Sequence, residues 1–188
     1  MAMNYANSEP IILGSGELYI GLASDIADLT SLTTVEEEAL VNIGAIEAGA
    51  SLTITNQKAD VVSANRGKLM KFLIDRDVKF TTGILTWDSQ NVCDFLLGGS
   101  YSEEKDVSDV VISKKMVIGS KDVLPDVYLR FVHTKKDGGK LTVNIYKANF
   151  DGELSFLFEK EKATTINYEF MAMAHDNNNY VEIIETMA

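Results

Sequence analysis

The side chains best suited to catalysis or metal binding are few and widely separated in this sequence. It contains two histidines, His133 and His175, and a single cysteine, Cys93. A metal site usually needs histidine or cysteine pairs at helix or turn spacing, which these residues do not provide. We interpret both histidines as surface residues near turns. Cys93 is expected to be a small buried apolar residue, because a reactive thiolate needs a neighbouring base or cation.

Carboxylates are abundant, but they occur as close neighbours in the sequence, at 36–38, 103–104 and 75 with 77. Glycosidase-type catalysis needs two carboxyl groups that flank one bond, and sequence neighbours rarely take that arrangement. Asp75 and Asp77 could share a strand face and form a weak cation site. The glycine patterns of phosphate and dinucleotide sites and the Gly-X-Ser-X-Gly pattern are absent. We therefore predict no catalytic, cofactor-binding or metal-ligating residue, and no enzymatic activity.

The composition is that of a soluble folded domain with an acidic charge balance. Of 188 residues, 46% are apolar and 24% charged, and no apolar run is long enough to span a membrane. The single cysteine suggests a reducing compartment. Lysine and arginine number 17 against 28 acids, for a net charge of −11, which is the reverse of a nucleic-acid-binding protein. No basic residue precedes Lys58, so the acidic first part is either an interaction segment or a solvated face.

The elements that must position these residues are mostly strands. Alternating apolar and polar residues predict strands at 17–21, 50–57, 78–88, 126–134, 141–146, 154–158 and 166–170. Asp88 and the pair Gly98-Gly99 are start and stop signals for one helix between them. Regular strands at this spacing indicate a β-sandwich or barrel with one flanking helix.

The remaining segments predict the domain boundaries. Residues 1–13 are expected to form a flexible N-terminal arm, and residues 14–188 a single β-rich domain. Within this domain 24–40 is predicted to be a long loop with at most a short helix. Residues 100–124 are predicted to be a long loop, or alternatively a weak hairpin, and 65–75 fits either a helix or a strand.

The order of these elements resembles that of a bacteriophage major tail protein, the subunit of the tail tube. The resemblance is carried by the loose apolar arm, the Glu17–Gly21 strand and the acidic loop. It extends through the glycine-punctuated stretch 41–52, the single helix, and the closing strands at 138–150 and 158–172. It covers nearly the whole chain without a diagnostic motif, and 100–124 fits it least.

The resemblance implies a structural virion protein. It implies a hexameric ring whose subunits pool strands into one large inner barrel, with rings stacked into a tube that conducts DNA. Such a protein would be assembled in the cytoplasm of the host bacterium. Its partners would be further copies of itself and the tape-measure, tail-terminator and baseplate or distal tail proteins. The DNA would pass without specific binding, and neither cofactor nor membrane would be involved.

We predict two sets of functional residues from this resemblance and from the polar strand faces. A conduit should not hold DNA, and we expect these faces to carry no lysine or arginine that would bind phosphates. The lumen-lining candidates are Ser51, Thr53, Thr55, Gln57, Thr142, Asn144, Thr165, Asn167 and Glu169. The candidates for contacts between subunits or rings are Ile11, Ile12 and Leu13 in the arm, the acids Glu36, Glu37 and Glu38, and the bases Lys58, Arg66, Lys68 and Lys71.

Three other functions remain open from the sequence. A monomeric small-ligand-binding β-barrel would use Phe156, Phe158, Tyr168 and Phe170 to line its cavity. An enzyme built on acidic residues would need a convergent carboxylate pair. A fibre or pilus subunit would polymerise into a thread without a lumen.

Overall fold

The protein, seen in a computed structural model that describes residues 16–44, 46–119, 123–155 and 166–187, is mainly β. Its main sheet is antiparallel and has eight strands. Seven of them follow the order β2-β1-β7-β8-β9-β4-β3, and β10 also pairs with β8. Their bounds are β1 Glu17–Leu22, β2 Val41–Asn42, β3 Ile46–Ser63, β4 Gly67–Ile84, β7 Val127–Thr134, β8 Lys140–Phe150, β9 Ile166–Ala172 and β10 Val181–Thr186.

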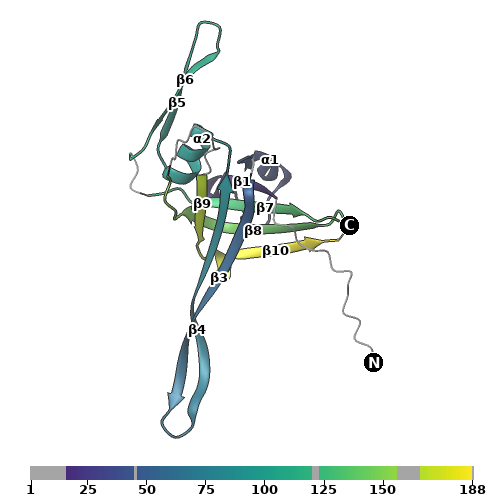
Figure 1. Ribbon diagram of the computed structural model, residues 1–188, viewed down its shortest axis with the longest axis vertical. Coiled ribbons are helices and arrows are strands. Elements are labelled where there is room, and N and C mark those ends of the chain that lie inside the picture. Colours follow the sequence, from purple (N-terminus) through teal and green to yellow (C-terminus); the bar gives the residue numbers. More distant parts are fainter. Residues whose placement is uncertain (1–15, 45, 120–122, 156–165, 188) are drawn as a thin grey trace.

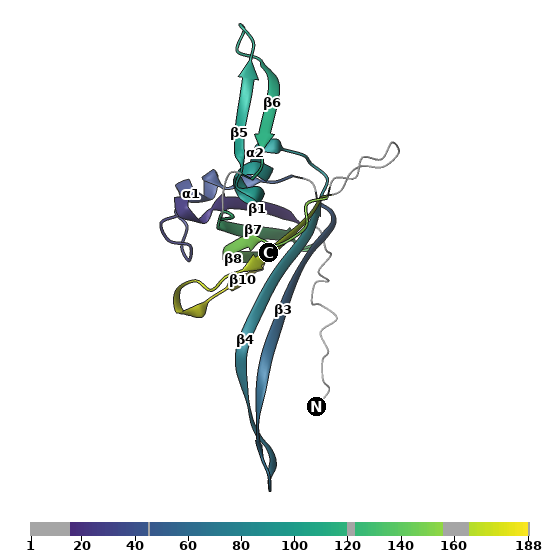
Figure 2. The ribbon, with the colours of Figure 1, turned by 90° about the vertical axis from the view of Figure 1, so that its left-hand side faces the viewer.

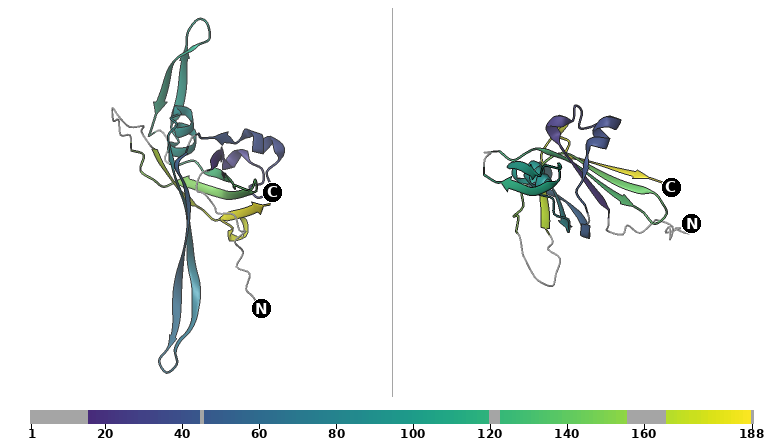
Figure 3. Two further views of the ribbon diagram at one scale, coloured as in Figure 1. Left: turned by 45° about the vertical axis from the view of Figure 1, so that its right-hand side comes forward. Right: turned by 90° about the horizontal axis from the view of Figure 1, so that it is seen from above.

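Strand β8 joins the two halves of this sheet. Its first part pairs with β10 and its last residues, 148–150, pair with β9. A register irregularity in the β7–β8 pairing, between Val127 and Leu129, falls next to the same place. The strands β9, β4 and β3 consequently cross β7 and β8 steeply (Figure 1; Figure 3). The sheet curls around its own core, but the described residues form no closed barrel.

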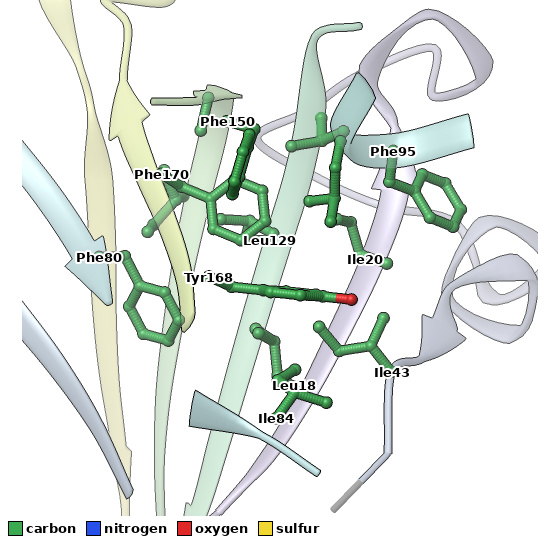
Figure 4. Packing of buried hydrophobic residues seen from close by; sticks show 14 of the residues in the cluster. Leu18, Ile20, Ile43, Phe80, Ile84, Phe95, Leu129, Phe150, Tyr168 and Phe170 are labelled. Atoms are coloured by element: carbon green, nitrogen blue, oxygen red, sulfur yellow. The ribbon is translucent and has the colours of Figure 1, made fainter. Parts of the chain in front are cut away.

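The core lies on one face of the sheet, which we call the core face. Aromatic residues from β4, β8 and β9 meet there, and Phe150 contacts Tyr168 and Phe170 edge to face, with ring centroids 6.5 and 6.1 Å apart. Aliphatic residues from β1 and β7 complete the cluster, including Leu18, Ile20 and Leu129 (Figure 4). One cluster therefore receives side chains from both halves of the sheet.

The predicted helix is confirmed between Asp88 and Gly98. It begins as α2, Ser89–Asn91, and continues as a wider π-helical turn, η2, over Val92–Leu97. The Asp88 carboxylate accepts hydrogen bonds from the backbone N–H groups of Gln90 and Asn91, at 2.9 and 3.0 Å. Gly98 ends the helix in the left-handed conformation, with φ of 60°. The helix closes one end of the core, and Cys93 is fully buried in it, as expected.

The acidic segment 23–40 covers part of the opposite sheet face. It contains the 3-10 turn η1, Ala23–Asp25, and the short helix α1, Thr34–Ala39. Ile26 and Leu29 of this segment pack on Tyr128 and Tyr146 and form a second apolar cluster. The prediction of a loop with at most a short helix is confirmed.

Two hairpins project from the body in opposite directions along its long axis (Figure 1; Figure 2). One is formed by the distal parts of β3 and β4. The other is β5, Ser100–Lys105, with β6, Val111–Val117. The long-loop prediction for 100–124 is thus wrong over 100–117, where the hairpin alternative holds. Lys114 forms an ion pair with Glu103 across its strands, and Asp106 forms the turn by accepting hydrogen bonds from the N–H groups of Ser108 and Val110.

Other expectations need correction or fall outside the described residues. His133 is 4% exposed, so its predicted surface position is wrong, and His175 is half-buried. The 65–75 segment is a strand from Gly67 onward, and the strand predicted to reach Asp88 ends at Ile84. The sequence reading missed β10. Residues 1–15 include the predicted arm and, like most of the predicted 154–158 strand, lie outside the described residues.

Candidate functional site

Most of the predicted lumen-lining residues lie together on the face opposite the core, which we call the polar face. In the β3–β4 pairing Ser51 lies opposite Thr81, and Thr53 lies opposite Lys79. Strand β9 extends the same face, because Thr81 also lies opposite Glu169. Residues directly opposite each other on paired strands point to the same side of a sheet. The members are Ser51, Thr53, Thr55 and Gln57 of β3, Asp75, Asp77, Lys79 and Thr81 of β4, and Asn167, Glu169 and Met171 of β9.

The polar face carries a lysine, contrary to the expectation from the sequence. Lys79 lies on it, but its ammonium group forms an ion pair with the Glu169 carboxylate of the neighbouring strand. Both side chains are about one third exposed. With Asp75 and Asp77 the face has a net charge of −2. The sequence alone does not show that Lys79 lies beside Thr53, because that placement depends on the register between β3 and β4.

The other predicted lumen candidates do not join this exposed surface. Asn144 of β8 is 4% exposed, where it accepts a hydrogen bond from Arg130 Nε and donates one to Glu182. Thr142, on the same strand face, is half-buried. Thr165 lies outside the described residues. The exposed lumen candidates within the described residues therefore lie on β3 and β9, with β4 between them.

The distal part of the long hairpin, residues 58–73, reverses the polarity of the two faces. Close to the body the core face is apolar, and Leu52 lies opposite Phe80. Beyond the Gln57–Asp75 pair an apolar group continues the polar face instead: Ala59 opposite Phe72, and Val61 opposite Met70. The continuation of the core face there is mixed: Lys68 and Lys71 both form ion pairs with Asp60, and Leu73 and Val62 lie beside them.

A β-bulge accounts for this reversal on β4. Gln57 pairs with Asp75, but the next residue of β3, Lys58, pairs with Leu73. Ile74 is therefore an extra residue on β4. An extra residue inverts the side to which all later side chains of that strand point. On β3 the apolar residues Ala50, Leu52 and Ile54 take even positions, whereas Ala59 and Val61 take odd ones. The consequence is an exposed apolar surface, with Met70 57% and Phe72 50% exposed.

Some of the charged interface candidates already form contacts within the subunit. Glu36 accepts hydrogen bonds from the N–H groups of Ala27 at 2.7 Å and Thr33 at 2.8 Å. These backbone bonds lower the pKa of its carboxyl. Glu37 pairs with Arg130 at 2.7 Å. Glu38, Lys58 and Arg66 are exposed, whereas the arm residues Ile11, Ile12 and Leu13 lie outside the described residues.

Among the described residues, no group of side chains has the arrangement of a metal site or a ligand cavity. They contain no cluster of three or more histidine, cysteine or acidic side chains that could hold a metal ion. Asp77 is instead a hydrogen-bond acceptor for Gln57 at 3.2 Å. Of the four residues proposed to line a ligand cavity, Tyr168 and Phe170 are 4% and 0% exposed and fill the core, and Phe156 and Phe158 lie outside the described residues. Burial, and to a smaller extent the negative charge of Asp88, raises the pKa of Tyr168 to about 12. Its hydroxyl group is therefore not tuned to release a proton near neutral pH.

Comparisons with known proteins leave the family undetermined. No protein-family model matches the chain, and no curated protein matches it either. Within the described part of the chain, no helix has both the length and the apolar character needed to cross a membrane.

Proposed function

We propose that this protein is a structural subunit that polymerises into a tube of the bacteriophage tail type. In this proposal subunits close into hexameric rings, and the rings stack into a conduit through which DNA passes. The proposal rests above all on strand β3. It is 18 residues long, about 60 Å at the usual rise per residue, and it ends the order of the described sheet.

An open edge of this length favours pairing with another chain. Its unpaired backbone N–H and C=O groups are a template for a further strand, and monomeric proteins usually shorten, charge or cover such edges. Ring closure satisfies the edge by continuing β9-β4-β3 into the sheet of the next subunit. The polar face then forms one continuous wall.

The chemistry of the polar face supports its assignment to the lumen. Hydroxyl and amide side chains dominate it, its net charge is negative, and its single lysine is neutralised by Glu169. Each free lysine–phosphate contact adds to DNA affinity, so such a wall lets the duplex slide. The lumen residues of the proposal are therefore Ser51, Thr53, Thr55, Gln57, Asn167 and Glu169.

The proposed partners follow from the tube. They are other copies of this chain and, at the two ends, tape-measure, tail-terminator and baseplate or distal tail proteins. The proposed location is the virion, after assembly in the cytoplasm of the host bacterium. No catalytic group, cofactor or membrane contact takes part.

Electron microscopy of the purified protein at high concentration, in low and high salt, tests this proposal. We expect hollow tubes with a regular axial repeat, promoted by salt because screening weakens repulsion between subunits of charge −11. Solid threads would support the fibre or pilus alternative. Monomers at every salt and protein concentration would overturn the tube proposal.

A further inference from the structure

Two surfaces at opposite ends of the molecule both expose apolar side chains and carry opposite charges. The first is the distal hairpin, residues 58–73. It has the apolar face formed by Ala59, Val61, Met70 and Phe72, and it has four basic residues against one acid. A two-stranded ribbon with an exposed apolar face is only marginally stable alone in water, so a surface that covers this face would stabilise it.

The second surface is a groove of about 350 Å³ between α1 and the 89–97 helix. Its apolar lining includes Leu22, Val35, Leu40 and Phe95, and its acidic lining residues are Asp25, Glu36 and Asp94. Val35 is 76% exposed, although it is an apolar residue on a helix. The segment 23–40 that forms one wall carries five acids and no base, of which Glu36 and Glu37 are already engaged within the subunit.

The positions of the two surfaces exclude contact within one subunit. Both helices lie in the part of the body away from the tip of the β3–β4 hairpin, in two perpendicular views (Figure 1; Figure 2). A hairpin from one copy and a groove from another meet when the copies are placed head to tail along the long axis. Such a contact joins two different surfaces, so it can repeat from copy to copy, and a displacement along the long axis makes the repeat an open stack.

We propose that the groove between α1 and the 89–97 helix receives the apolar face of the distal hairpin from a second copy of this chain. The hairpin places Val61 and Phe72 against Val35 and Leu40, and its bases lie near Asp25 and Asp94. The bulge at Ile74 is essential here, because it places the apolar residues of both strands on one face. This inference names the contact between rings and rests on the proposed function.

Single substitutions with neighbouring controls test each surface in the full-length protein. Val61→Asp places a charge on the apolar hairpin face, whereas Val62→Asp places it on the opposite face, across from Lys68. Val35→Arg blocks the groove, and Thr34→Arg adds the same charge one residue away, outside the groove lining. We expect Val61→Asp and Val35→Arg to raise the critical concentration for polymerisation at least about tenfold, and both controls to polymerise like the wild type.

A mixing experiment identifies the two surfaces as partners. The Val61→Asp protein keeps an intact groove, and the Val35→Arg protein keeps an intact hairpin. Neither should polymerise alone, but the mixture should give a discrete two-layer complex by analytical ultracentrifugation and electron microscopy. A mixture in which nothing new forms, or a Val35→Arg protein that polymerises normally, would overturn the inference.

The outcomes separate this inference from the proposed function. If the wild type forms hollow tubes and the Val35→Arg protein does so equally well, the tube stands and the groove contact falls. If the wild type forms solid threads and the mixture still gives a two-layer complex, the contact stands and the tube falls. If neither the wild type nor the mixture associates, both are overturned.

Discussion

Replacing Phe170 with alanine tests the assignment of the core face of the sheet. Phe170 is 0% exposed, and its ring packs edge to face on Phe150 at 6.1 Å and on Tyr168 at 6.2 Å. Loss of a buried phenylalanine costs about 3–5 kcal/mol through lost transfer energy and the cavity left behind. Because two aromatic contacts are also lost, we expect the upper end, about 4–5 kcal/mol. That is a large share of the roughly 5–15 kcal/mol by which folded domains are stable.

The matched control is the next residue, Met171. It is half-buried and points to the polar face, so Met171→Ala should cost less than about 1.5 kcal/mol. Both values are measured as shifts of the urea unfolding midpoint, after checking that the slope m is unchanged. The assignment of core face and polar face would be refuted if Met171→Ala destabilised the protein as much as Phe170→Ala.

Three further predictions concern local features. The pKa of Glu36 is lower in the folded protein than its ordinary value of 4.5. Its contribution to stability is therefore fully present above pH 4.5 and is lost as the pH falls through the pKa of the folded state. Hydrogen exchange in segment 23–40 should therefore accelerate in acid, and an identical acceleration in Glu36→Gln would contradict this. Gly98→Ala should cost about 1–2 kcal/mol in thermal unfolding, since φ is 60° there, and an unchanged melting temperature would contradict it. Glu169→Gln should make tubes retain DNA at low salt by freeing Lys79, and retention that persists in Glu169→Gln combined with Lys79→Met would refute that cause.

Local signals in the sequence were sufficient for the helix and for most strands. Asp88 and Gly98 act within a few residues of the helix ends, through hydrogen bonds and backbone conformation that depend on nearby sequence. The alternation along β7, β8 and β9 is equally local, because side-chain direction in a strand repeats every two residues. The burial of Cys93 followed from its place on the apolar side of that helix.

Features that depend on pairing between distant residues required the tertiary structure. Lys79 joins the polar face only because β4 pairs with β3 and β9 in one register, and His133 is buried through the strands that surround it. The bulge at Ile74 is equally non-local, since an extra residue exists only relative to a partner strand. The sequence by itself therefore determined which segments are strands and which is the helix. Only the tertiary structure decided which face each side chain occupies, because one residue of register inverts a strand.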